Sequence, residues 1–166
     1  GYTMQKPEEE KYLMNKDEIV DEITVFMAGR AAEEVVFGVK TTGAANDIER
    51  ATELARNMIT IYGMSDKFGM FGLESIQNRY LDGRRVANCS QETETLVDAE
   101  VTKILADCYS KAVEILMNNR EALDKISEFL IEKETITGKQ FMEIYQSVKN
   151  PPEELPPSDE EAESSE

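Results

Sequence analysis

Apolar residues recur at helical spacing through most of this chain, and that spacing constrains its fold more than any other feature. In the first run, Asn15 and Glu18 predict a capping box, the helical period continues to Phe37, and Gly38 predicts the C-cap. Four further helices are predicted. The first runs from about Gly43 to Tyr62 after Thr41 or Thr42. The second runs from Ser90 to Asn119 and carries on one face Val97, Val101, Ile104, Cys108 and Ile115. The third carries Leu123, Ile126 and Leu130, and the last is capped by Thr137. The sequence therefore predicts a mainly α fold, a helical bundle of about five helices.

The ends of the chain and one long connection lack this periodicity. At the start, "YTM" predicts a short N-terminal strand segment, and the glycine-rich stretch over residues 63–90 predicts a connection with a short strand or two. The tail "NPPEELPPSDEEAESSE" combines proline pairs with dense acid, and it holds too little apolar surface to offset the entropy of ordering. We therefore expect one domain over residues 1–148 and a disordered acidic tail over residues 149–166.

Charge and composition exclude several classes of function. The formal net charge of −16 argues against nucleic acid as a partner, because binding to phosphates relies on Lys and Arg. The chain has no histidine, so alone it can form neither a Ser–His or Cys–His catalytic pair nor a zinc site with His ligands. Cys89 and Cys108 are too far apart for a CxxC motif and favour a reducing compartment. No apolar run approaches the roughly 18 residues of a transmembrane helix, and we expect a soluble chain.

The helix predicted over residues 43–62 carries an aspartate on its apolar face. Asp47 shares one stripe with four apolar residues, namely Ala51, Leu54, Met58 and Ile61. Aspartate is almost never fully buried without a partner, and a divalent cation would supply one. Alternatively, Asp47 lies in the first turn because a negative charge there favours the helix dipole, with Asn46 or Thr42 as the cap. The stripe alone leaves both interpretations open.

Three other polar side chains are candidate neighbours of such a cation. Glu33 and Glu34 could be rival ligands, or they could orient another metal ligand, because an adjacent carboxylate can orient a ligating side chain. The spacing favours a different role for Glu34, which is expected to pair with Arg30 while Glu33 faces solvent or a neighbouring helix. Asn46 could hydrogen-bond beside the metal or cap the helix.

The connection over residues 63–90 carries three apolar side chains outside any predicted helix, namely Met64, Met70 and Phe71. Methionine adapts to varied apolar partners, so these side chains could line a groove for unfolded polypeptide. Packing within the core or against another subunit explains them as well, and both interpretations stay open.

Several long motifs together resemble one family. "AGRAAEEVVFG" and "TTGAANDIERATELARNMITIYGMS", followed by "SQETETLVDAEV" and "AVEILMNNREALDKISEFLIEKETITGKQF", resemble the C-terminal part of the peptidase domain of FtsH-type ATP-dependent zinc metalloproteases. The resemblance covers roughly residues 1–145. It implies that Asp47, in the "ND" pair after the Gly-Ala dipeptide, is the third protein ligand of zinc. The other two ligands in that family are the histidines of an HExxH helix, whose glutamate is the general base.

This sequence contains neither HExxH nor the phosphate-binding loop of an ATPase. We therefore expect it to be the downstream portion of the peptidase domain, inactive alone and without a catalytic residue of its own. The resemblance implies a parent protein that is a homo-hexamer, uses ATP and magnesium, and degrades unfolded or membrane-extracted polypeptides in protein quality control. It also implies a membrane anchor in segments absent here, with the peptidase domain on the cytoplasmic side or its organelle equivalent. The alternative is a non-catalytic helical interaction module for assembly.

Overall fold

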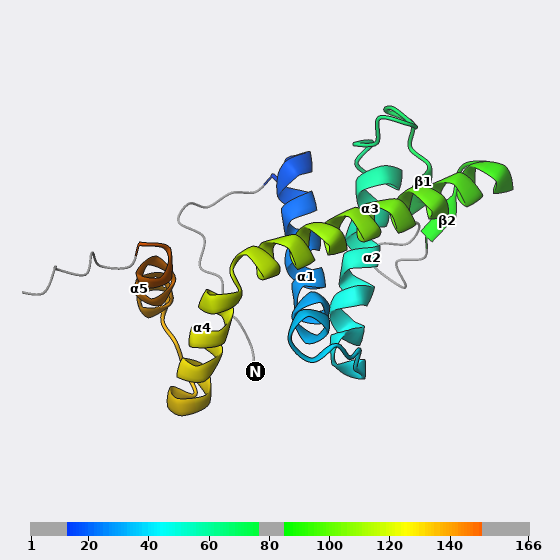
Figure 1. Ribbon diagram of the computed structural model, residues 1–166. Coiled ribbons are helices and arrows are strands. Elements are labelled where there is room, and N and C mark those ends of the chain that lie inside the picture. Colours follow the sequence, from blue (N-terminus) through cyan, green and yellow to red (C-terminus); the bar gives the residue numbers. More distant parts are fainter. Residues whose placement is uncertain (1–12, 77–84, 151–166) are drawn as a thin grey trace, which may run out of the picture. The chain divides into compact units, whose positions relative to one another are not determined.

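The computed structural model describes residues 13–76 and 85–150 (Figure 1). The chain divides into two compact units, residues 1–117 and residues 118–166, and each is described by itself. Five α-helices and two short strands lie in the described residues, as the mainly α prediction requires. The predicted N-terminal strand and nearly all of the predicted acidic tail fall outside those residues.

The first helix, α1 (Lys16–Phe37), has the ends that its sequence predicts. The Glu18 backbone N–H donates to Asn15 Oδ1 at 3.0 Å, and the Asn15 N–H donates to Glu18 Oε2 at 2.8 Å. At the other end, Gly38 adopts φ +67° and its N–H donates to the Glu34 carbonyl. A residue with a side chain is strained at that φ, so the glycine ends the helix at low cost.

The second helix begins later than its sequence predicts. Thr41 Oγ1 accepts a hydrogen bond from the Gly43 N–H at 3.1 Å and caps a short 3₁₀ turn, η1 (Thr42–Ala44). The α-helix itself, α2 (Ala45–Thr60), has Ala44 at its N-cap and no side-chain cap. The threonine signal was therefore correct, but it initiates a 3₁₀ turn because tighter hydrogen bonding is common at the start of an α-helix.

The core of the first unit lies between α1, α2 and the long helix α3 (Gln91–Asn118). Its fully buried members include Ile19, Ile23 and Ala31 from α1, Ala51, Ala55 and Ile59 from α2, and Val97, Val101, Cys108 and Ala112 from α3. Cys108 Sγ lies 3.7 Å from the Val20 carbonyl, and Lys111 pairs with Asp21 at 2.8 Å, which ties α3 to α1.

One residue of the predicted buried face of α3 is exposed. Val97, Val101 and Cys108 are buried as expected, but Ile115 keeps 48% of its surface exposed. Ile115 lies one turn beyond the ion pair of Lys111 with α1, close to the end of α3. Helical spacing predicts the face of a helix but not how far along the helix its partner extends.

The connection between α2 and α3 contains the strands predicted for it. β1 (Glu74–Ile76) pairs with β2 (Arg85–Ala87) in an antiparallel sheet, with Ser75 opposite Val86. Leu73, just before β1, is 1% exposed and hydrogen-bonds to the Thr60 carbonyl at 3.1 Å.

The three apolar side chains that were candidates for a groove lie in different settings in this connection. Met64 packs against the core, whereas Met70 is 98% exposed and Phe71 is 57% exposed. Core packing therefore accounts for Met64 alone. The groove for polypeptide stays a prediction for Met70 and Phe71.

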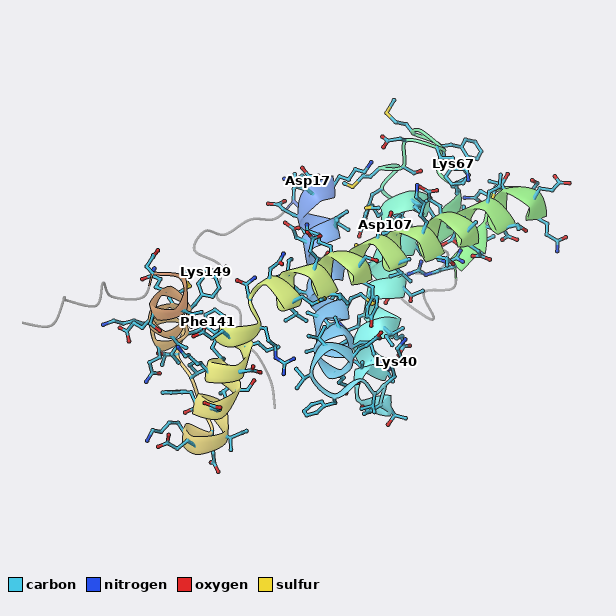
Figure 2. The ribbon with its side chains drawn as sticks, in the orientation of Figure 1. Asp17, Lys40, Lys67, Asp107, Phe141 and Lys149 are labelled. Atoms are coloured by element: carbon cyan, nitrogen blue, oxygen red, sulfur yellow. The ribbon has the colours of Figure 1, made fainter. Side chains whose placement is uncertain are left out.

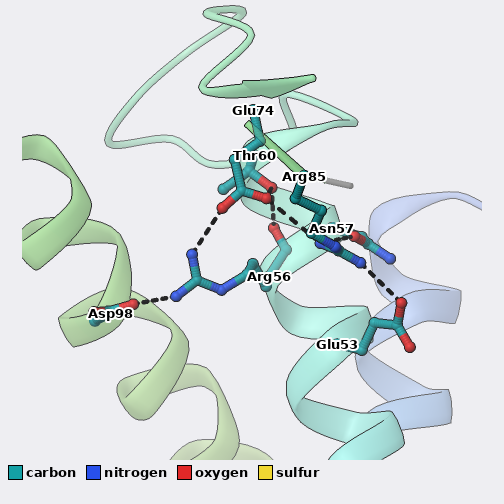
Figure 3. Close-up of polar contacts among 7 residues, drawn as sticks. All are labelled: Glu53, Arg56, Asn57, Thr60, Glu74, Arg85 and Asp98. Atoms are coloured by element: carbon teal, nitrogen blue, oxygen red, sulfur yellow. Dashed lines mark hydrogen bonds and ion pairs between the residues drawn. The ribbon is translucent and has the colours of Figure 1, made fainter. Parts of the chain in front are cut away.

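A polar cluster joins this hairpin to α2 and α3 (Figure 3). At its centre, the Glu74 side chain is only 12% exposed and accepts hydrogen bonds from Arg56 at 2.8 Å, Thr60 at 3.3 Å and Arg85 at 3.4 Å. Both arginines also donate hydrogen bonds to other helices. Arg56 donates to Asp98 on α3, and Arg85 donates to Asn57 and Glu53 on α2. A carboxylate with so little exposed surface is stable here because Arg56, Thr60 and Arg85 all donate to it.

The second unit contains α4 (Arg120–Lys133) and α5 (Gly138–Lys149), which contact each other. Thr137 and Gln140 form a capping box, so the predicted cap of the last helix is correct. Ala122 is the one buried residue among those described in this unit, whereas Ile131 is 83% exposed and Phe141, labelled in Figure 2, is 41% exposed. Within the described parts of both units, none of the helices combines the length and apolarity needed to cross a bilayer.

The cluster around Glu74 predicts a stability defect for Glu74→Ala. The change leaves the Arg56 and Arg85 guanidinium groups without their shared partner, and loss of one partner of a buried hydrogen-bonded group costs about 1–3 kcal/mol. Thermal unfolding should show the midpoint falling by roughly 3–10 °C. The control is Glu53→Ala, whose exposed pair with Arg85 should contribute less than about 1 kcal/mol. Equal midpoints for the two variants would show that the cluster does not stabilise the hairpin.

Candidate metal centre

Asp47 lies in the first turn of α2, in line with residues that are completely buried. Ala51, Ala55 and Ile59 follow it at intervals of four residues, and each has 0% exposed surface, whereas Asp47 itself is half-buried. The buried line therefore passes through Ala55 and Ile59, and the predicted stripe members Leu54 and Ile61 are only partly buried. The aspartate does extend the core-facing side of the helix, as its sequence predicts.

The Asp47 carboxylate faces a glycine of the neighbouring helix. A Cβ atom built on Gly29 of α1 would lie 3.9 Å from Asp47 Oδ2, and no other atom outside the surrounding backbone comes within 4 Å of it. Within residues 13–76 and 85–150, no hydrogen bond or ion pair to the Asp47 side chain occurs. This half-buried carboxylate thus has no partner among the described side chains that would compete with a cation.

Glu33 makes contacts that its sequence does not predict, and its role beside a metal stays a prediction. Its Oε1 accepts a hydrogen bond from Thr41 Oγ1 at 2.6 Å, and its Oε2 accepts one from the Thr41 N–H at 3.1 Å. The two bonds from Thr41 lower the pKa of the Glu33 carboxyl, and the positive charge of Arg30 adds to this effect. Glu33 therefore anchors the turn that leads into α2 and does not face solvent freely.

Arg30 and Glu34 do not form the predicted pair. The Arg30 guanidinium donates to the Thr41 carbonyl at 2.7 Å and lies 3.8 Å from Glu33, three residues along the helix. Glu34 instead accepts hydrogen bonds from Tyr109 and pairs with Lys40 at 3.2 Å. Burial, followed by the bond to Glu34, raises the pKa of Tyr109 to about 12. The prediction failed because Arg30 reaches a backbone carbonyl in the following turn, which helix spacing does not reveal.

Asn46 is exposed and lies inside the first turn of α2. It is therefore not the N-cap, and the capping interpretation for it is wrong. Its side chain precedes Asp47 directly, which leaves a role beside a metal as a prediction.

The described residues fit one position of a metal site and no more. No group of three Asp, Glu, Cys or His side chains that could hold a metal ion occurs among them. A carboxylate oxygen is a normal ligand for zinc, and Asp47 meets the requirement of a half-buried, unpaired donor. The remaining ligands of a catalytic site, which needs about three protein donors, would have to come from outside this part of the chain.

Comparison with known proteins identifies the class to which this chain belongs. Residues 1–144 match the family model of Peptidase family M41, and the chain is a member of that family. Three curated relatives carry the name ATP-dependent zinc metalloprotease FtsH: those of Clostridium perfringens at 60% identity, Lancefieldella parvula at 51% and Thermotoga maritima at 48%. Each alignment covers 87% of this chain.

The same alignments cover only 20%, 22% and 24% of those relatives. The chain therefore spans about a fifth to a quarter of the length of the curated relatives it matches. The resemblance stated from the motifs is confirmed at the level of the family.

The anchor that Glu33 forms with Thr41 was missed by sequence reasoning. The signal that could have found it is the pair of threonines that begins three residues after the C-cap Gly38, since a hydroxyl near a helix C-terminus can turn back to a carboxylate in the preceding turn. This contact positions the start of α2 and hence Asp47, which lies six residues after Thr41.

The lowered pKa of Glu33 predicts a pH-dependent contribution to stability. Because the pKa in the folded state lies below the ordinary value of 4.5, the contact stabilises the fold above that value and is lost as the pH falls through the folded-state pKa. Glu33→Gln should lower the thermal midpoint near about pH 7, and the difference from wild type should shrink below about pH 4. Glu49→Gln, at an exposed position of α2, should shift the midpoint little at either pH. A Glu33→Gln defect that grows toward acid pH would contradict this account.

Proposed function

We propose that this chain is part of an ATP-dependent zinc metalloendopeptidase and that Asp47 supplies the third protein ligand of its zinc ion. The observation that carries the proposal is the Asp47 carboxylate, half-buried in line with the core and without a partner among the described side chains. Membership of Peptidase family M41 and the names of the relatives support the choice of zinc.

The chain's own residues hold this carboxylate in a defined direction. Ala51 and Ala55, one and two turns further along, are buried against α1 and fix the rotation of α2. The turn before α2 is held by the contacts of Glu33 and Arg30 with Thr41. A rigid helix with a supported start positions a ligand more accurately than a free loop does.

A zinc ion held in part by Asp47 would supply Lewis-acid chemistry toward the scissile carbonyl and toward a nucleophilic water. A ligand set of two histidines and one carboxylate would need both histidines from elsewhere, because this sequence has none. The general base would come from the same source. In this proposal, Asp47 contributes negative charge and orientation but moves no proton.

The wider properties of the parent protein are part of the same proposal. A homo-hexameric ATPase that uses ATP and magnesium would deliver unfolded or membrane-extracted polypeptides to the peptidase site, from a membrane anchor outside this chain. The word ATP-dependent in the relatives' names supports the coupling, and their greater length leaves room for an ATPase module. The formal net charge of −16 supports the absence of a nucleic-acid partner.

A second candidate is a non-catalytic helical module for assembly. The observation that favours it lies in the second unit, where Ile131 is 83% exposed and Phe141 and Met142 are 41% and 46% exposed. Apolar side chains of this kind suit contact with another protein surface. The two candidates differ in one requirement, since only the peptidase needs Asp47.

The purified chain alone should hydrolyse no unfolded protein. It supplies one metal ligand among its described residues and no histidine anywhere, so a catalytic zinc site cannot be completed. Casein hydrolysis should stay at background with and without added zinc, while the Clostridium perfringens relative serves as the positive control. Cleavage by the purified chain that a chelator abolishes would contradict the proposal.

The ligand role of Asp47 predicts a selective defect for Asp47→Asn. The test replaces the matching segment of the Clostridium perfringens relative, 60% identical, with residues 1–144 of this chain. Asparagine keeps the shape of the side chain but is a much weaker zinc ligand, so bound zinc and ATP-dependent casein hydrolysis should be lost together. Helicity by circular dichroism should persist.

The matched control is Glu49→Gln, which makes the same change from acid to amide one half-turn further along α2 at an exposed position. It should retain zinc and activity. Full zinc content and turnover in Asp47→Asn would place the third ligand elsewhere. Unfolding of that variant would show that the carboxylate serves the fold and not the metal.

A further inference from the structure

Gly29 occupies a position in α1 where neither backbone geometry nor packing requires glycine. It lies inside a continuous helix of 22 residues, with no positive φ. Among the described residues, a Cβ atom there would meet only Asp47 Oδ2, at 3.9 Å, which is an ordinary van der Waals contact. Alanine would therefore fit, and it would favour the helix because glycine has a low helix propensity.

The contact that Gly29 makes indicates what the glycine provides. Residue 29 is exposed, so its outer side is not covered by the described residues. In the part of the chain that the structure describes, the side chain that borders it is the carboxylate proposed as a zinc ligand, and the bordering atom is a carboxylate oxygen. A side chain longer than alanine adds atoms beyond a Cβ that already lies 3.9 Å from that oxygen, whereas glycine adds none.

We infer that Gly29 is a positioning residue that keeps the space in front of Asp47 Oδ2 open, so that a divalent cation can reach the carboxylate. This inference rests on the proposed role of Asp47. It assigns Gly29 no contact with substrate. Its effect is on the affinity of the metal for the site, and through the metal on turnover.

The test uses the same relative of Clostridium perfringens carrying residues 1–144 of this chain, with Gly29 changed to Ala, Gln or Leu. Alanine should leave zinc affinity close to that of the parent. Gln and Leu should weaken zinc affinity by roughly tenfold to a hundredfold, the usual cost of disturbing the surroundings of a metal ligand. The d–d absorption of the cobalt-substituted protein should change in the same two variants.

Stability of the metal-free protein separates this role from a packing role. All three residues are better helix formers than glycine, so the thermal midpoint in the presence of chelator should be unchanged or higher. Val25→Gln is the matched control, one turn earlier on α1 at a position 56% exposed, and it should leave zinc affinity and the cobalt spectrum unchanged.

Each outcome decides between the alternatives. Zinc affinity within about threefold of the parent in both Gln and Leu variants would overturn the inference, since outer-sphere disturbance costs more than that. A lower midpoint of the metal-free Gln variant would also overturn it, because Gly29 would then serve packing. If Asp47→Asn keeps its zinc, the proposed function fails first; if Asp47→Asn loses zinc while Gly29→Gln retains it, only the inference about Gly29 fails.

Discussion

The packing of α1 against α2 is the constraint on which the rest of this structure depends. On α2, Ala51 and Ala55 are small and completely buried, and on α1 Ala31 is buried in the same way. Small residues allow the two helices to approach closely, and this approach brings the first turn of α2 beside Gly29. Farther along, the Arg50 guanidinium lies 4.6 Å from the centre of the Phe26 ring and holds the same pair of helices from the outside.

Local signals in the sequence predicted most of the helices and their ends. The capping boxes at Asn15 and Thr137 and the glycine C-cap at residue 38 involve residues within three or four positions of each other, so the sequence contains all of the interacting groups. The aspartate on the apolar face of α2 was found in the same way. Such features are predictable because their geometry is that of the helix itself.

Contacts between distant residues were not predictable in this way. Arg56 was not expected to meet Glu74, and Arg30 was expected to pair with Glu34 when it reaches the turn at Thr41 instead. In both cases the path of the chain after a helix ends determines which residue lies beside the arginine, and hydrophobic periodicity does not predict that path. The surroundings of Asp47 belong to this group, because Gly29 lies eighteen residues earlier and only the packing of the helices brings the two together.

Two explanations were considered for Asp47, namely a metal ligand and a negative charge that favours the helix dipole, and they are compatible with each other. A carboxylate in the first turn of a helix gains about 0.3–1 kcal/mol from the helix dipole, and partial exposure lowers the cost of its desolvation. The first-turn position of Asp47 therefore does not compete with a role as a metal ligand. Acidic residues outnumber basic ones by 34 to 18, so an acid without a partner is common in this chain, but its place in line with Ala51, Ala55 and Ile59 is not. A metal-free fold that keeps this carboxylate in position is what a ligand on a preformed site requires.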